Sequence, residues 1–116
     1  MLSKKIIISQ QNSIHLVDSE EIIFCKSDNS YTFIHLLNSR KLIVVKSLSK
    51  IAKEQLCLPG FIRVSQSYLV NINFISSINK KTKELILSND QSIPFTTTLK
   101  ELFTLMFDNN LFITVN

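Results

Sequence analysis

Glycine, proline, tryptophan and long apolar runs are scarce or missing in this chain. Its one glycine, Gly60, excludes a Walker loop and a dinucleotide fingerprint, because both motifs need several glycines where backbone approaches phosphate. The longest apolar runs, such as residues 42–45, are far shorter than the ~20 residues of a membrane-spanning helix, and no signal-peptide core is present. We therefore expect a soluble cytoplasmic protein that needs no nucleotide cofactor.

Cysteine is also scarce, and its placement argues against redox or metal chemistry. Cys25 and Cys57 lie singly in apolar surroundings, which predicts two buried free thiols. His15 and His35 have no carboxylate or cysteine at ligand spacing, so they are expected to be satisfied or surface histidines. Cys25 and His35 could meet across a hairpin, but no third group is placed to orient them. With its carboxylates scattered, the chain is not expected to be an enzyme or to hold a metal.

Positive charge is concentrated in the middle of the chain. Residues 40–83 hold nine of the 13 Lys and Arg but one of the nine acids, so this segment carries +8 and the remainder −4. Such segregation is typical of a protein that binds a polyanion, although solvated lysines on loops and helix faces would explain it equally well. If the first interpretation holds, the segment should form one continuous basic face with Arg63 near its centre.

The 116 residues fit one domain with a self-sufficient core. Alternation of apolar and polar residues predicts short antiparallel strands, namely Lys5–Ile8, Ile14–Val17, Ile22–Lys26, Tyr31–Leu36, Lys41–Val45, Phe61–Val64, Phe74–Ile78, Glu84–Leu87, Gln91–Phe95 and Leu111–Val115. The stretch Phe61–Asn71 is apolar and interrupted by a polar, partly cationic turn. A mainly β fold follows.

Two segments have helical periodicity instead. Leu48, Ile51, Ala52 and Leu56 follow Ser47, which can cap the first turn, and Pro59 with Gly60 ends the element. Further on, Thr98 and Glu101 form a capping box before an apolar stripe from Leu99 to Phe107. The second helix is expected to lie on a sheet.

Several of these segments follow one another in a specific order, namely Ile22–Phe24 with the loop Ser27–Ser30, Tyr31–Leu36, Val45–Leu48, Phe61–Val64, Ser67–Asn71 and Ile93–Thr96. In this order, over roughly residues 22–103, the chain resembles the LytTR family of bacterial DNA-binding domains. The resemblance implies a mainly β domain with small antiparallel sheets and two short helices, which inserts loops into successive grooves of DNA. In this sequence the matching loops are Ser27–Tyr31, Ser65–Ser67 and Thr96–Thr98.

The resemblance also implies which residues contact DNA. They are Asn29, Ser30, Tyr31, Lys46, Lys50, Arg63, Ser65, Gln66, Ser67, Tyr68, Asn71, Thr96, Thr97 and Thr98. Arg63 is expected to contact phosphate, and Gln66 can bond bidentately to adenine. Thr98 is expected to cap its helix and Thr97 to contact DNA. Where the family usually carries cations, this chain has Ser65, Gln66 and the three threonines, so up to three cations are missing.

These observations favour a sequence-specific regulator of transcription that binds double-stranded DNA. In the family a receiver domain usually precedes this one, and residues 1–21 are too short to hold it, so the chain is either a piece of a response regulator or a free-standing regulator. With few loop cations, one copy should bind weakly, and we expect a homodimer on two similar half-sites. The alternative is a protein-interaction domain that keeps the fold and no longer reads bases.

Overall fold

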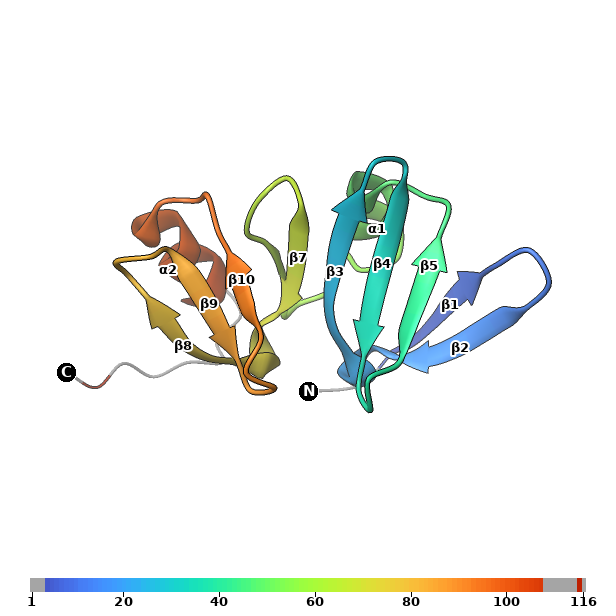
Figure 1. Ribbon diagram of the computed structural model, residues 1–116, viewed down its shortest axis with the longest axis horizontal. Helices are drawn as coiled ribbons and strands as arrows, with labels where there is room; N and C mark the ends of the chain where they lie inside the picture. Colours follow the sequence, from blue (N-terminus) through green and yellow to red (C-terminus); the bar gives the residue numbers. More distant parts are fainter. Residues whose placement is uncertain (1–3, 108–114, 116) are drawn as a thin grey trace.

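The computed structural model describes residues 4–107 and Val115. It is mainly β, as the sequence predicts, with two α-helices and two short 3₁₀ helices (Figure 1). The strands are β1 (Lys5–Ser9), β2 (Ile14–Asp18), β3 (Ile22–Asp28), β4 (Tyr31–Leu36), β5 (Lys41–Val44), β6 (Phe61–Arg63), β7 (Tyr68–Asn71), β8 (Ile75–Asn79), β9 (Glu84–Leu87) and β10 (Ser92–Pro94). The helices are η1 (Ser19–Glu21), α1 (Leu48–Glu54), η2 (Ile72–Phe74) and α2 (Leu99–Phe107). Among the described residues, no helix is long and apolar enough to cross a membrane.

The strands form three antiparallel sheets. Five strands pair in the order β5-β4-β3-β7-β6, three in the order β10-β9-β8, and β1 pairs with β2. The stretch Phe61–Asn71 folds back on itself as the β6–β7 hairpin, with its polar turn at the tip. The strand predicted over Leu111–Val115 lies, except for its last residue, outside the described residues.

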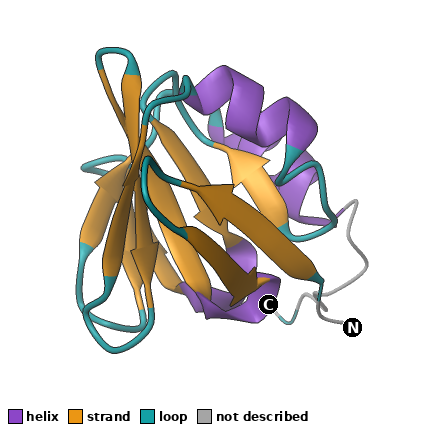
Figure 2. Ribbon diagram, turned by 90° about the vertical axis from the view of Figure 1, so that its right-hand side faces the viewer, coloured by secondary structure: helices purple, strands orange, loops and turns teal. Residues whose placement is uncertain are grey.

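Two buried clusters hold the sheets together. The first lies among β1 to β5 and α1, and the second among β6 to β10 and α2. Strands β3 and β7 serve both, because Cys25 and Leu69 point into the first cluster while their neighbours Phe24 and Val70 point into the second. Both α-helices lie on the same side of the sheets, behind them in Figure 1 (Figure 2).

The helices begin where their capping residues predict. The Ser47 hydroxyl accepts a hydrogen bond from the Lys50 amide at 3.2 Å, and the Thr98 hydroxyl accepts one from the Glu101 amide at 3.1 Å. Each bond satisfies an amide that has no partner within its own helix. Each capping residue comes shortly after a strand, so the caps set the positions at which the chain leaves the sheets and begins a helix.

Candidate nucleic-acid interface

Three loops gather along one edge of the domain. The β3–β4 turn, the β6–β7 turn and the segment between β10 and α2 all reach the upper edge in Figure 1, beside the start of α1. Backbone hydrogen bonds join them: the Ser27 amide donates to the Ser67 carbonyl at 2.9 Å, and the Thr96 amide donates to the Val64 carbonyl at 3.0 Å. The three loops therefore present their side chains as one surface, which we call the loop edge.

Arg63 holds the β6–β7 turn in shape. Its Nε donates to the Ser65 carbonyl at 2.8 Å, and a terminal nitrogen donates to the Gln66 carbonyl at 2.6 Å. The other terminal nitrogen lies 3.4 Å from the Ser49 hydroxyl on α1. Partial burial lowers the pKa of Arg63, but arginine remains charged at any physiological pH. The structure shows a guanidinium that holds the backbone of the turn at Ser65 and Gln66, and the phosphate contact predicted for Arg63 stays a prediction.

A shallow hollow of about 260 Å³ opens between the loops. Its lining comes from the β3–β4 turn, the start of α1 and the β6–β7 hairpin, namely Ser27, Asn29, Ser47, Leu48, Ser49, Arg63 and Gln66. Hydroxyl and amide groups prevail, and these can bond to phosphate oxygens or base edges. Ser49 was missed by the sequence reasoning, since a serine in the first turn of a helix carries no signal beyond capping.

The predicted contact residues divide by exposure. The exposed ones are Asn29, Ser30, Tyr31, Lys50, Gln66, Ser67, Thr96 and Thr98. Asn29 has a φ of 56°, a left-handed conformation that asparagine tolerates well and that a tight β3–β4 turn requires. Partly buried are Lys46, Arg63, Ser65, Tyr68 and Thr97. Lys46 also pairs with Glu54 at 3.5 Å, so its charge is partly neutralised.

Asn71 is not available to DNA. It is 3% exposed, its Nδ2 donates to the Ile22 carbonyl at 2.9 Å, and its Oδ1 accepts from the Asn73 amide at 3.0 Å. Both halves of the side chain thus satisfy backbone groups where β7 passes into η2. The contact predicted for Asn71 is wrong, and its role is to join β7 to β3.

Thr97 differs from its predicted placement, whereas the DNA contact predicted for Tyr68 stays a prediction. The Thr97 hydroxyl is buried and has no hydrogen-bond partner among residues 4–107 and 115, so it points inward although the loop is at the surface. Tyr68 lies on the face of the five-stranded sheet, where its ring packs 6.1 Å from Phe24 with Lys26 above it at 5.9 Å. The Tyr68 side chain therefore lies on the face of the sheet, and the Thr97 side chain lies inside the loop.

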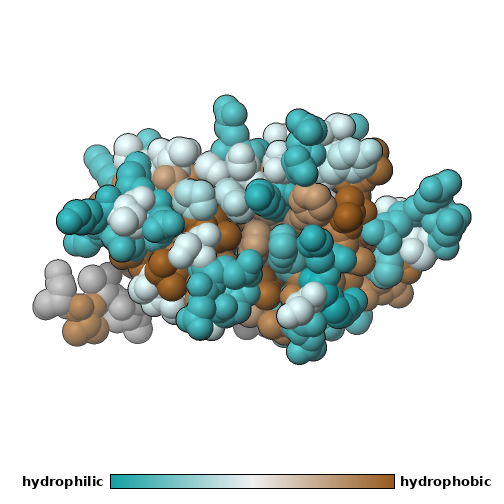
Figure 3. Space-filling view, viewed as in Figure 1, coloured by the Kyte–Doolittle hydropathy of each residue, from teal (hydrophilic) through white to brown (hydrophobic). Residues whose placement is uncertain are grey.

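The basic segment does not form one continuous face. Lys50 and Arg63 lie at the loop edge, but the β4–β5 turn, which carries Arg40, lies at the opposite edge (Figure 1). Arg40 pairs there with Glu21 at 3.7 Å. In an antiparallel sheet, consecutive turns lie at opposite edges, so charged residues that are close in sequence are separated in space. Along the loop edge the visible surface is mainly hydrophilic (Figure 3).

The catalytic alternative finds no support in the described part of the chain. Phe24, not Cys25, pairs with His35, and the two rings stack with centroids 4.2 Å apart. Cys25 therefore faces the opposite side of the sheet from His35, where burial raises the pKa of its thiol to about 12. His15 bonds to Ser13 and Gln10, and no three metal-ligating side chains cluster among the described residues. Both cysteines are free, but Cys57 is exposed, contrary to the prediction that it is buried.

Comparison with known proteins gives a family. The family model described as LytTr DNA-binding domain matches residues 12–108. Among solved structures, a LytTr DNA-binding domain from Bacillus cereus, attributed to a methyl-accepting/DNA response regulator, superposes with a TM-score of 0.68 at 18% identity, over 94% of this chain and 99% of that chain. No curated protein matches the sequence. Because the family model covers most of the chain, and because the fold has the expected sheets and helices, the chain belongs to the LytTR family of DNA-binding domains.

Proposed function

We propose that the loop edge binds double-stranded DNA in a sequence-specific manner and that the domain regulates transcription, as the output domain of a response regulator or on its own. The observation that carries this proposal is the bonding of three loops, far apart in sequence, into one edge, with a polar hollow between the β3–β4 turn, the start of α1 and the β6–β7 hairpin. A surface held in one conformation loses little entropy on binding. Binding to DNA implies that the protein is located in the compartment that holds the chromosome.

Within this interface the residues take different roles. Gln66 is exposed, and Arg63 fixes the backbone beneath it, so Gln66 is the side chain best placed to read a base edge. Lys50 is exposed and makes no ion pair among the described residues, which suits it to phosphate. Asn29, Ser67 and Thr96 supply further polar contacts.

The domain binds as a dimer on two similar half-sites. One loop edge with few cations provides little counterion release, so the affinity of one copy should lie near the non-specific range of ~10⁻⁴–10⁻⁶ M. A contact for a second copy is at hand on the β1–β2 hairpin, whose outer face exposes Ile7, Ile14 and Leu16 at 57%, 67% and 66%. Apolar groups exposed together mark interaction sites.

The test is binding to the DNA upstream of the protein's own coding region, titrated at two salt concentrations against random DNA of equal length. We expect tighter binding to the upstream fragment, and a linear fall of log affinity with log salt. Binding of equal strength to both fragments would exclude base reading. No binding to either, together with capture of a protein through the exposed hairpin, would favour the alternative of a protein-interaction domain.

A further inference from the structure

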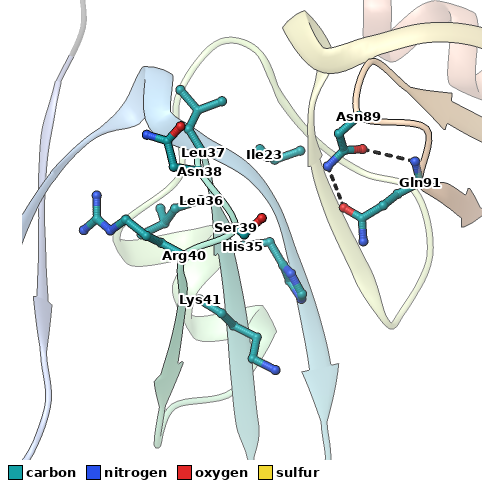
Figure 4. A pocket seen from close by; sticks show the side chains of 10 residues that line it. All are labelled: Ile23, His35, Leu36, Leu37, Asn38, Ser39, Arg40, Lys41, Asn89 and Gln91. Carbon is teal, nitrogen blue, oxygen red and sulfur yellow. Dashed lines mark hydrogen bonds between the residues drawn. The ribbon is translucent and has the colours of Figure 1, made fainter.

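Two adjoining hollows lie away from the loop edge and take no part in the proposed DNA contact. The larger, of about 570 Å³, lies between the β4–β5 turn and the β9–β10 turn (Figure 4). The smaller, of about 260 Å³, runs along β3, β4 and β10. His35, Lys41 and Gln91 line both, so the two hollows lie side by side. Sites for small molecules usually measure ~300–1,000 Å³, and this pair falls in that range.

The lining is cationic. Lys26, Arg40 and Lys41 contribute to it, and no Asp or Glu does. Arg40 has Glu21 3.7 Å away, whereas Lys26 and Lys41 make no ion pair among the described residues. Lys41 instead lies 5.0 Å from the Phe33 ring. Unpaired cations around a concave surface favour the entry of an anion.

Polar donors complete the larger hollow. Asn89 Nδ2 donates to Gln91 Oε1 at 2.6 Å, which turns Gln91 Nε2 away from Asn89 (Figure 4). The backbone amide of Gln91 donates to Asn89 Oδ1 at 3.1 Å, so two hydrogen bonds join Asn89 and Gln91. Nε2 makes no hydrogen bond within the described residues, and it remains as a donor for an anion that Lys41 attracts.

The smaller hollow differs in character, because rings and apolar side chains line it. Phe24, Phe33 and Tyr68 surround it together with Ile93. His35 stacks against Phe24 with an interplanar angle of 14°, so Phe24 covers one face of the imidazole ring and leaves the other face for a ligand ring. Burial, then Lys41 and Lys26, lower the pKa of His35, and its ring is mainly uncharged near neutral pH. A flat ring can pack here without burying a charge.

We propose that the two hollows bind one small aromatic anion, with its phosphate or carboxylate among Arg40, Lys41 and Gln91 and its ring beside His35. The ligand would lie beside both buried clusters, since Leu36 of the first and Ile23 of the second line the larger hollow. Strands β3, β4 and β10 lead from these hollows directly into the loops of the loop edge. Ligand binding therefore changes DNA affinity, a consequence that rests on the proposed function.

Ligand binding is tested without DNA, by NMR of the whole chain titrated with AMP, benzoate and inorganic phosphate. We expect AMP or benzoate to shift the His35 ring signals and to raise the pKa of His35, and phosphate alone to bind more weakly. Lys41→Gln should weaken binding by up to about fivefold, the effect of losing one exposed charged contact of about 1 kcal/mol. Lys100→Gln, an exposed lysine on α2, is the matched control and should bind like the native chain.

Three results would overturn the proposal: no shift at His35 with any probe, equal loss in both lysine variants, or phosphate binding as tightly as AMP. AMP and benzoate distinguish a phosphate ester from a carboxylate as the preferred anion. DNA affinity is then measured with and without the tighter probe. If the ligand binds and DNA affinity stays the same, the coupling between the two sites is wrong while the ligand site stands, since coupling requires a reciprocal change in affinity.

Discussion

Replacing Arg63 by lysine separates two roles that an alanine variant would confound. The native guanidinium donates to two carbonyls of the β6–β7 turn, at 2.8 and 2.6 Å. A lysine ammonium keeps the charge but lacks the planar fork that spans both carbonyls. If Arg63 acts by positioning Gln66, lysine should fail; if Arg63 acts by contacting phosphate, lysine should serve almost as well.

The magnitudes follow from the bonds. Hydrogen bonds from a charged donor contribute about 1.5–3 kcal/mol, and a half-exposed pair lies at the lower end, so Arg63→Ala and Arg63→Lys should each lower the free energy of unfolding by about 1–2 kcal/mol. A turn that no longer orients Gln66 should lose most of the discrimination of one base contact, about 1–3 kcal/mol. Both variants should therefore lose preference for the upstream fragment to a similar degree.

The assay is fluorescence anisotropy on upstream and random DNA at several salt concentrations. Lys50→Gln is the control, and it should lower the salt slope by about 0.9 without altering preference, as the loss of a phosphate contact does. Two results together would refute the positioning role. They are a lysine variant of Arg63 that keeps the native preference for upstream DNA, and an alanine variant whose salt slope falls by about 0.9 on all DNA.

Four further outcomes can be checked directly. Thr97→Val should raise the free energy of unfolding by about 1 kcal/mol, because it removes an unpartnered buried hydroxyl, and DNA affinity should not change; weaker DNA binding at unchanged stability would show that the hydroxyl contacts DNA. Under native conditions a thiol reagent should modify Cys57 within minutes and Cys25 only after denaturant is added, and simultaneous labelling would contradict the burial of Cys25. Burial and two nearby lysines lower the pKa of His35 in the folded chain. The free energy of unfolding should therefore be highest above pH 6.5, the pKa of an unperturbed histidine, and should fall as the pH drops from 6.5 toward the folded pKa. Urea titrations of the native chain and of His35→Gln should differ in how steeply this free energy changes with pH. Leu16→Ser should weaken binding to a double half-site and leave a single half-site unaffected, and equal weakening on both would exclude the hairpin as the dimer contact.

The local features of the fold could be predicted from the sequence, whereas the roles of several side chains could not. The caps at Ser47 and Thr98 depend on neighbours within three residues, and the strand alternation depends on neighbours within two. The roles of Asn71 and Arg63 depend on what the chain brings beside them: β3 lies alongside β7 across more than 40 residues of sequence, and α1 supplies Ser49 to the guanidinium. Such partners leave no trace in a local pattern.

The candidate site shows the same limit. The three loops were identified from the family's segments, and the structure places them together. The cap at Thr98 was predicted correctly, but the inward direction of Thr97 was not predicted, since Thr96, Thr97 and Thr98 are chemically identical yet lie exposed, inward and at the helix cap. Charge was misjudged for a topological reason, because the β4–β5 turn carries part of the basic segment to the opposite edge.

Strands β3 and β7 each contribute side chains to two different cores. Because each core needs side chains from both strands, we expect the two halves of the domain to fold together and not in independent steps. The loop edge draws one loop from the first half, one from the shared hairpin and one from the second. A molecule that loses either core should therefore lose the whole loop edge in the same event, and, if the loop edge binds DNA as proposed, no half-folded fragment would be left to occupy a promoter and block the intact protein.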